Sequence, residues 1–428
     1  MNGRNRILLI AYNFPPLISP QSLRWFYLSR ELFRRGYEID VLTIKMPDKF
    51  LDLLDMIPKE LNMHRTFPVP FYYMTFKYSR ESSNREGSGI SVKPSPFLRI
   101  LSGIHFKTYK TLSTLLIPDI YSEWLPFATK EGLRLIKSNE YGIIISSSDP
   151  RVCHLIGYLL KKKSDILWIA DYGDPWIYPV PILTEPDFKK KIIEKIERKI
   201  LKKMDAITVA AEGIKRLYLE RYPFLDKNKI HIITQGFDTD MFSQTKEGTS
   251  SKFRIVYCGS FYKNLRDPMA FFEAIKEISK EDIEVIIAGR IHEFAEILRK
   301  EFNNGAIKYR GFLSHKASLA LQKSATILLH IGNTSDVQVP GKIYEYIGAK
   351  RPILCVRGGD SDISADLISR YNKGIIVDNT KEAIKEGTLK FYELWKKDLL
   401  ANSFNLNTTE EFTWQKSAKD IMNIIETL

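Results

Sequence analysis

The sequence predicts an α/β protein made of two doubly wound domains, each built around a parallel sheet. Short apolar runs alternate with amphipathic segments along most of the 428 residues, which is the pattern of parallel strands joined by helices. A polar stretch at residues 245–252 interrupts this alternation, which then starts again. A chain of this length suits two domains, each with its own core.

The first half opens with a β-α-β unit. Residues 6–12 are a continuous apolar run, expected as a strand that is covered on both faces. Residues 21–36 place most apolar side chains on one side of a helix that ends at Gly36, and residues 37–44 are the second strand. Further along, strands are expected at residues 141–148, 165–176, 205–211 and 229–238, with helices at residues 150–163 and 188–204.

The region between the second and third of these strands has no regular pattern. Residues 47–96 are irregular, and their last part, residues 80–96, is polar with glycine, serine and proline, which predicts a loop. Residues 97–124 mix apolar and basic side chains. Together with the basic helix at residues 188–204 they either rest on an anionic membrane or present a solvated lysine face.

The second half repeats the strand–helix alternation. Strands are expected at residues 253–260, 283–289, 306–313, 325–332, 351–356 and 373–379, and helices at residues 267–278, 314–324 and 341–349. The amphipathic segment at residues 412–428 is expected to pack back onto the first half. We therefore predict domains at residues 1–245 and 253–404, followed by a C-terminal helical segment at 405–428, with a site in the cleft between the domains.

Charge and cysteine content narrow the partners. The net charge of +13 suits nucleic acid, a phosphate-bearing ligand or an anionic membrane surface, and no nucleic-acid-binding motif accompanies it. Cys153, Cys258 and Cys355 lie far apart and are expected to be buried, without a disulfide or zinc site.

No apolar run approaches the roughly 18 residues of a membrane span. The N-terminus is expected to be a first strand, not a signal peptide, which predicts a cytoplasmic protein.

The segment DVQVPGKIYEYIGAKRPIL contains a lysine and a glutamate three residues apart at the start of a helix. Pro340 is tolerated in the first turn of the helix, and Gly341 permits close approach of a phosphate. Lys342 adds positive charge to a helix N-terminus that favours anions. Glu345 shares a face with Lys342, and its carboxylate suits a vicinal diol such as a ribose. The alternative is a surface ion pair on an ordinary helix.

Several segments, in order along the chain, resemble the GT4-like (group 1) family of GT-B glycosyltransferases. VPGKIYEYIGAKRPIL looks like the donor-site segment of that family, and YNFPPLISPQSLR resembles its first loop. The other resembling segments are SSSDPRVCHLIG, WIADYGDPW, IERKILKKMDAITVAAEGI, ITQGFDTDMF, IVYCGSFYKNLRDP and FTWQKSAKDIM. The resemblance implies the GT-B fold: two Rossmann-like domains that face a central cleft.

The resemblance also implies transfer of a sugar from a nucleotide-sugar donor to a glycan, lipid-linked or small-molecule acceptor, with retention and without a metal. Glu345 would hold the ribose hydroxyls, while Lys342 with Arg266 or Lys263 would neutralise the diphosphate leaving group. The donor contacts implied in full are Ser19, Gly259, Ser260, Lys263, Arg266, Val339, Pro340, Lys342, Tyr344 and Glu345. No cofactor and no nucleic-acid partner are expected.

Three polar residues near the middle of the first half are the candidates for catalysis. His154 would contact the transferred sugar or act in acid–base work, or else be a buried structural histidine. Asp171 and Asp174 follow a strand and would bind acceptor hydroxyls or act as a base, or else cap turns. Trp176 would stack on a sugar or pack in the core. The DTD sequence at residues 238–240 has metal-site spacing, but a turn with helix capping is the favoured interpretation.

Two departures from the family pattern keep other functions open. The first glutamate of the family's E-x7-E pair falls on Val337 here, with Asp336 out of register, and the glycine pair of the first loop is replaced by ISPQ. These departures leave the retaining outcome open, and they suggest as an alternative a non-catalytic scaffold with a degenerate GT-B fold. A basic nucleic-acid-binding protein is a weaker alternative. The main hypothesis is a cytoplasmic GT-B glycosyltransferase, with association at the inner face of the membrane left open.

Overall fold

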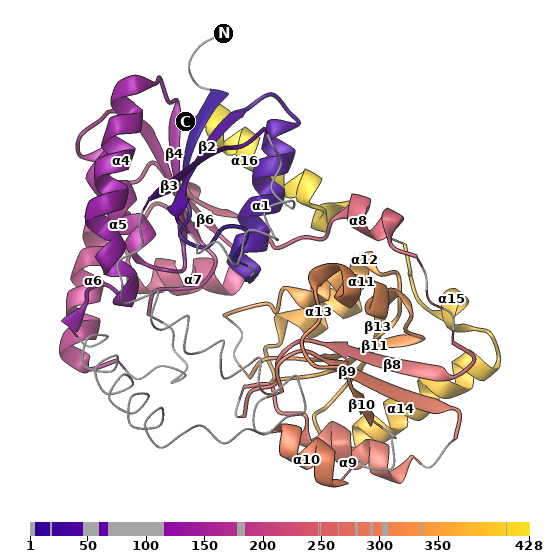
Figure 1. Cartoon of the computed structure of the whole chain (residues 1–428). Helices are drawn as coiled ribbons and strands as arrows, with labels where there is room; N and C mark the ends of the chain where they lie inside the picture. The colour runs from indigo at the N-terminus through magenta and orange to yellow at the C-terminus, as the bar shows by residue number, and fades with distance from the viewer. Residues whose placement is uncertain are drawn as a thin grey trace, which may run out of the picture. The chain divides into compact units, whose positions relative to one another are not determined.

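The computed structural model describes residues 5–428 except residues 18, 46–59, 67–114, 178–184, 247, 249, 264, 279–280, 292–293, 302–306, 335–336 and 408. The chain divides into two compact units, unit 1 (Met1–Thr234 with Ser417–Leu428) and unit 2 (Gln235–Lys416). Figure 1 shows a sheet in each. The loop expected at residues 80–96, most of the stretch 97–124, and Asp336 lie outside the described residues.

Unit 1 contains a parallel sheet of seven strands in the order β3-β2-β1-β4-β5-β6-β7. The strands are β1 (Arg6–Ile10), β2 (Glu38–Ile44), β3 (Asn62–Thr66), β4 (Ile143–Ser148), β5 (Leu167–Tyr172), β6 (Ala206–Val209) and β7 (Ile230–Ile232). Most of β1, β2, β4 and β5 is buried, as their continuous apolar sequences predict. The order of the strands reverses between β1 and β4, which is where such sheets open a crevice for ligands.

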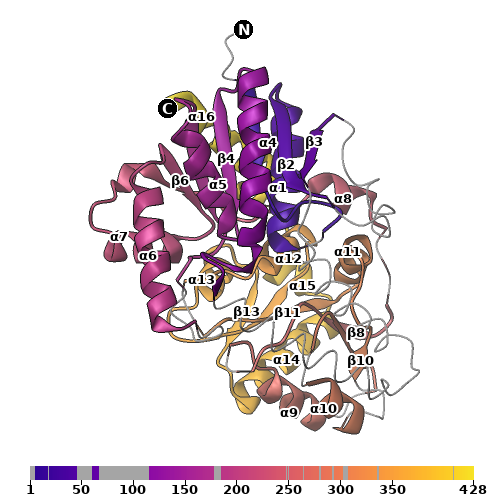
Figure 2. The same ribbon diagram turned by 60° about the vertical axis from the view of Figure 1, so that its left-hand side comes forward.

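Helices cover both faces of this sheet. The helices of unit 1 are α1 (Pro20–Phe33), α4 (Leu125–Ser138), α5 (Val152–Lys161), α6 (Asp187–Leu201) and α7 (Glu212–Arg221), with 3-10 turns at Ile120–Trp124 and Lys227–Lys229. Figures 1 and 2 show α4 and α5 on one face and α1 on the other. The last helix, α16 (Trp414–Thr427), belongs to unit 1 from Ser417 onward. No helix of the described part of the chain is long and apolar enough to cross a membrane.

The edge strand β3 lies where the sequence predicted irregular structure. Its five residues, NMHRT, do not show the alternation of apolar and polar side chains that marks a strand, and none of them is buried. The strand is held by backbone pairing with β2 and by its side chains: Nε2 of His64 lies 2.6 Å from Oδ1 of Asp40, and the Thr66 hydroxyl accepts a hydrogen bond from the Trp124 indole. Such a strand depends on long-range pairing, which hydrophobic patterning does not report.

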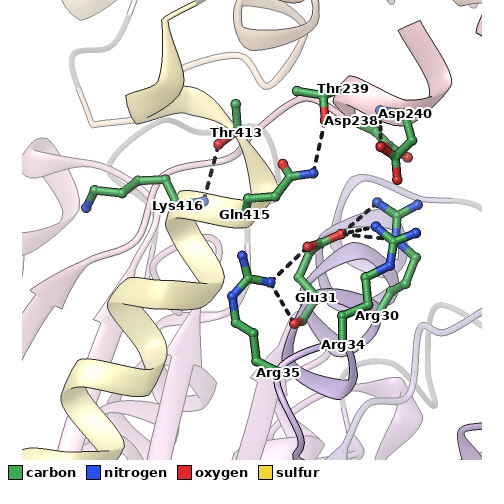
Figure 3. Close-up of polar contacts among 10 residues, drawn as sticks. All are labelled: Arg30, Glu31, Arg34, Arg35, Asp238, Thr239, Asp240, Thr413, Gln415 and Lys416. Atoms are coloured by element: carbon green, nitrogen blue, oxygen red, sulfur yellow. Dashed lines mark hydrogen bonds and ion pairs between the residues drawn. The ribbon is translucent and has the colours of Figure 1, made fainter. Parts of the chain in front are cut away.

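A buried carboxylate near the end of α1 is surrounded by arginines. Glu31 is 2% exposed, and its carboxylate accepts hydrogen bonds from the guanidinium groups of Arg30, Arg34 and Arg35 at 2.9–3.3 Å. Figure 3 shows these three groups converging on it. A buried acid is tolerated because each oxygen has charged donors.

Unit 2 contains a second parallel sheet, of six strands in the order β10-β9-β8-β11-β12-β13. The strands are β8 (Phe253–Cys258), β9 (Ile283–Ala288), β10 (Ile307–Tyr309), β11 (Ile327–Ile331), β12 (Ile353–Val356) and β13 (Gly374–Val377). The strand order reverses between β8 and β11. The two parallel-sheet domains predicted from the sequence are thus present.

Unit 2 has one apolar core on each face of its sheet. Ile255 and Tyr257 of β8 point to one core and Val256 and Cys258 to the other, as the alternation of side chains along a strand requires. Figure 1 shows α9, α10 and α14 on the first side and α11, α12 and α13 on the second. The helices are α8 (Thr239–Gln244), α9 (Met269–Glu277), α10 (Phe294–Glu301), α11 (His315–Lys323), α12 (Lys342–Gly348), α13 (Ile363–Arg370), α14 (Lys381–Lys396) and α15 (Leu400–Ser403), with a 3-10 turn at Glu410–Phe412.

The two ends of unit 2 meet. The Phe237 amide donates to the Phe412 carbonyl at 3.0 Å, and the Trp414 amide donates to the Phe237 carbonyl at 3.3 Å. The Gln415 amide donates to the Thr239 hydroxyl at 3.0 Å (Figure 3). Asp238 caps α8 by accepting from the Asp240 amide at 3.0 Å, which confirms helix capping for the DTD sequence. The three cysteines are free and buried, as predicted.

Candidate functional site

The loops that follow β8 and β11 meet where the strand order of unit 2 reverses. Nη2 of Arg266, in the loop after β8, donates to Oδ1 of Asn333, just after β11, at 2.7 Å. The Thr334 amide donates to the Leu265 carbonyl at 3.1 Å. These bonds join the loops that carry most of the predicted donor-binding residues. They place those residues at the carboxyl edge of the sheet, where ligands of such folds bind.

Glu345 is the centre of a polar cluster at the start of α12. Its Oε2 accepts from Nζ of Lys342 at 2.5 Å and from Nε2 of Gln322 at 2.9 Å, and Nε2 of His315 lies 3.3 Å from Oε1. The Glu345 side chain is 14% exposed and that of Lys342 is 34% exposed. Lys342 and Glu345 are therefore brought together, and Glu345 also contacts two residues of α11 that the motif did not indicate.

The charge of Glu345 and its remaining hydrogen-bond acceptor positions define what it can bind. Burial would raise its pKa, but the charge of Lys342 and the nearby His315 hold the pKa of Glu345 well below its usual range, so the group is a carboxylate at neutral pH. A carboxylate has about four acceptor positions. Three are used here, one of them at the long distance of 3.3 Å, so a hydroxyl group has room to donate to Glu345.

The loop after β8 carries two of the predicted cationic donor contacts, Arg266 and Lys263. Nη1 of Arg266 donates to the Ser260 carbonyl at 3.3 Å, and the Tyr257 hydroxyl donates to the same carbonyl at 3.0 Å. The Gly259 amide donates to the Ala288 carbonyl at 2.9 Å. The Lys263 side chain is exposed. Lys342 also lies close enough to the end of β8 to lower the pKa of Cys258 against the larger effect of burial. Backbone and side-chain hydrogen bonds thus fix the loop, and the Lys263 side chain remains exposed.

Three further predicted donor contacts are placed differently. Tyr344 is 2% exposed and its ring packs 5.3 Å from that of Phe412, so it serves the core. Val339 is half-buried against the same core. The Pro340 carbonyl accepts from the Ile343 amide at 3.1 Å and so starts the first turn of α12. Val337, at the position of the missing family glutamate, is 6% exposed.

Unit 1 has a matching junction where its own strand order reverses. Nδ2 of Asn13, after β1, donates to the backbone carbonyl of Asp149, after β4, at 2.9 Å. Ser19 caps α1, with its hydroxyl accepting from the Ser22 amide at 3.1 Å. The Asp149 side chain is exposed. The loop that carries Ser19 is therefore tied to the edge of the sheet, and a carboxylate lies beside it.

Asp171 is enclosed within unit 1. It is 0% exposed and accepts hydrogen bonds from Arg24 at 2.9 and 3.1 Å, Trp25 at 2.8 Å, Thr208 at 2.7 Å and Gln21 at 3.0 Å. Burial would raise its pKa, but Arg24, also 0% exposed, and these hydrogen bonds hold the pKa of Asp171 below its usual range. The geometry gives Asp171 a structural role and does not favour contact with an acceptor.

His154 is also buried. Its Nδ1 lies 2.8 Å from the Ser146 hydroxyl, and that hydroxyl also accepts from the Trp168 indole at 2.9 Å. Burial lowers the pKa of His154 to about 3. The ring stacks 5.8 Å from that of Trp176, which is 2% exposed and donates to the Ser148 hydroxyl. The buried alternative for both residues agrees with this geometry.

Asp174 differs from Asp171 and His154, because it is half-buried at the end of β5. Burial raises the pKa of Asp174 to about 7, and the charge of Asp149 adds to that rise. Asp119, which caps the 3-10 turn before α4, has a pKa raised to about 7 by burial and by Asp149. Asp174 can therefore accept a proton near neutral pH, as a base for a hydroxyl group must.

Sequence analysis did not predict four residues of these sites: His315, Gln322, Asn333 and Asp149. Asp149 had a local signal, since it follows a strand directly, at the carboxyl edge of the sheet. His315 and Gln322 had none, because their partner Glu345 lies 30 and 23 residues further along the chain. Asn333 required the neighbour relation of β8 and β11.

Comparison with known proteins finds similarity to glycosyltransferases. Residues 252–393, about a third of the chain, match the family model described as Glycosyl transferases group 1. An uncharacterized glycosyltransferase of Methanocaldococcus jannaschii is 24% identical over 294 residues, covering 64% of this chain and 72% of its own. The region matched by the family model contains Glu345 and the loops that follow β8 and β11.

Solved structures agree in fold. A glycosyltransferase from Rickettsia africae ESF-5 superposes with a TM-score of 0.65 at 14% identity, covering 100% of this chain and 99% of its own. The HepE protein of Anabaena, crystallised in complex with UDP and glucose, superposes with a TM-score of 0.63 at 12% identity, covering 99% and 100%. These similarities confirm the predicted GT-B fold.

Proposed function

We propose that this chain, which has the GT-B fold and matches the group 1 glycosyltransferase model over residues 252–393, moves a sugar from a nucleotide-sugar to a glycan or lipid-linked acceptor. The observation that carries the proposal lies in unit 2, where ionised Glu345 is paired with Lys342 at the start of α12 and Arg266 joins the β8 and β11 loops through Asn333. UDP is the first nucleotide to test, because HepE, which shares the fold, was crystallised with UDP.

The residues of unit 2 would divide the donor between them. Glu345 would accept hydrogen bonds from the ribose hydroxyls, with the weak contact to His315 giving way. Lys342, Arg266 and Lys263 would face the diphosphate, on which negative charge grows as the glycosidic bond breaks. Fixed cations that meet this growing charge stabilise the transition state more than the ground state. We therefore propose that the reaction uses protein cations and no metal.

The acceptor would meet the carboxylates at the edge of unit 1. Asp174, with a pKa raised to about 7, is the proposed base for the acceptor hydroxyl, and Asp149 its neighbour. Retention at the anomeric carbon is the outcome that the family resemblance implies, although Val337 replaces one family carboxylate. An NMR measurement of the anomeric coupling constant of the product would decide between retention and inversion. The proposed setting is the cytoplasmic face of a membrane.

Thermal unfolding in the presence of UDP tests the donor site. At a UDP concentration about 100 times Kd, we expect one Tm of the intact chain, that of the UDP-binding unit, to rise by roughly 5–10 °C. Lys342→Ala and Glu345→Ala should remove that rise. Lys390→Ala and Glu393→Ala are matched controls, since they are exposed and equally spaced on α14, and they should retain it.

Two results would contradict the proposal. An unchanged rise in both Lys342→Ala and Glu345→Ala would exclude the assigned donor contacts. No shift with UDP, GDP, ADP or CMP and their sugars would exclude a nucleotide-sugar donor altogether.

A further inference from the structure

Helix α6 of unit 1 has an exposed face that combines basic and apolar side chains. At about 100° per residue, Phe188, Lys191, Ile192, Lys195, Lys199 and Lys202 fall in one stripe along it, and all six are exposed. Phe188 is 54% exposed and Ile192 36%. Two large apolar side chains on a lysine-rich face are unusual, because lysine and arginine alone would suffice for solubility.

The opposite face fixes the helix firmly to the unit. Glu197 is 1% exposed, and its two carboxylate oxygens accept hydrogen bonds from the hydroxyl groups of Tyr218 and Tyr222. Ile193 and Ile200 are fully buried on the same side. The orientation of α6 is therefore set by its buried face, and the exposed stripe is a stable feature of the surface.

Acidic side chains neutralise little of the charge on this helix. Asp187 lies 3.5 Å from Lys190, and Glu194 lies 3.6 Å from Arg198. Among the described residues, no acidic side chain pairs with the lysines of the stripe, Lys191, Lys195, Lys199 and Lys202. The stripe thus presents four positive charges without an acidic partner in the part of the chain that the structure describes.

A third apolar side chain extends the stripe beyond the helix. Phe224, which follows α7, is 39% exposed. The guanidinium carbon of Arg198 and Nζ of Lys202 lie 5.4 and 5.3 Å from the centre of its ring. These cation–π contacts hold the ring at the level of the charges. Phe188, Ile192 and Phe224, with the four lysines and Arg198, are called here the α6 face.

We propose that the α6 face docks unit 1 on the surface of an anionic phospholipid bilayer. The lysines match the negative headgroups, and the three apolar side chains can enter the boundary between headgroups and acyl chains. A nucleic acid would use the same charges but would leave Phe188 and Ile192 without a role. Docking deepens the proposed function, on which it rests for its lipid-linked acceptor, by placing unit 1 at the membrane that carries that acceptor.

Vesicle flotation with the full chain tests the charges. We expect partition onto vesicles of phosphatidylcholine with 30–40% phosphatidylglycerol, and little onto phosphatidylcholine alone. Each lysine near such a surface contributes about fivefold in partition, so the triple variant Lys191→Glu, Lys195→Glu, Lys199→Glu should lose at least tenfold. The matched control changes three exposed lysines on α4, α14 and α16, namely Lys137, Lys390 and Lys419, to glutamate. It has the same net charge and should stay within about twofold of the wild type in partition.

The double variant Phe188→Ser, Ile192→Ser tests the apolar part of the face. It keeps every charge and should lose about tenfold in partition, since each large apolar side chain contributes favourable free energy when the membrane buries it. Equal loss of partition in the control triple variant, or unchanged partition in the double variant, would overturn the proposal. The proposal would also be overturned if the wild-type protein bound duplex DNA as tightly as it binds anionic vesicles. The UDP shift is measured separately on each variant, so a failed lipid test and a failed donor test remain distinct.

Discussion

His154 and His330 are buried neutral histidines, one in each unit. Each is at most 3% exposed, and each has an Nε2 atom without a hydrogen-bond partner among the described residues. Burial lowers the pKa of each to about 3, with Arg266 adding to the effect at His330. Both must stay uncharged in the folded protein, while the same residues take up a proton in the unfolded chain below its ordinary pKa of 6.5.

This difference predicts a loss of stability in mild acid. The unfolded state binds more protons than the folded state between pH 6.5 and 3, so the free energy of unfolding must fall as the pH falls through that range. At pH 5.5 each histidine should reduce it by about 1.4 kcal/mol relative to pH 7.5. Urea unfolding at the two pH values measures the loss. His154→Gln and His330→Gln should each weaken the pH dependence of the free energy of unfolding. If both variants kept the pH dependence of the wild type, the buried neutral state would be contradicted.

At the scale of elements, one carboxylate connects α1 to the centre of the first sheet. Asp171 at the end of β5 accepts from Arg24 and Trp25 of α1 and from Thr208 of β6. Asp171→Ala leaves the buried guanidinium of Arg24 without its partner, and we expect unit 1 to lose about 3–5 kcal/mol of stability. Calorimetry measures that loss.

A paired substitution distinguishes this structural role from a catalytic one. Arg24→Met with Asp171→Leu removes both buried charges together and should recover much of the stability lost by Asp171→Ala, since apolar pairs replace buried ion pairs well. If Asp171 instead contacts the acceptor, Asp171→Ala would unfold at the wild-type temperature and would fail only in sugar transfer.

The same elements explain what the sequence could predict. Strands such as β1 and β4 are continuous apolar runs because both faces of a parallel sheet are covered, so pattern alone located them. The edge strand β3 is polar and was missed. Lys342 and Glu345 are three residues apart, so their pairing could be predicted locally. The burial of Asp171 could not, since its partners Arg24 and Thr208 come from distant parts of the chain.

At the scale of the whole molecule, each unit has its own parallel sheet, and the proposed donor contacts are concentrated in unit 2. Unit 2 also joins its own ends, through the hydrogen bonds of Phe237 with Phe412 and Trp414. Units with separate cores commonly unfold as separate cooperative transitions. The arrangement of the donor groups therefore allows ligand binding to be assigned to one unit by its effect on unfolding.

We predict two transitions in calorimetry of the intact chain, of which UDP raises only one. A ligand stabilises the unit that binds it by an amount set by its concentration over Kd, about 2.7 kcal/mol at a hundredfold excess. The transition that moves should be the one that Glu345→Ala makes insensitive to UDP, and the one that Asp171→Ala lowers should stay in place. If UDP moved the transition that Asp171→Ala lowers and left the other unchanged, the donor site would lie in unit 1, and the assignment of Lys342 and Glu345 would be wrong.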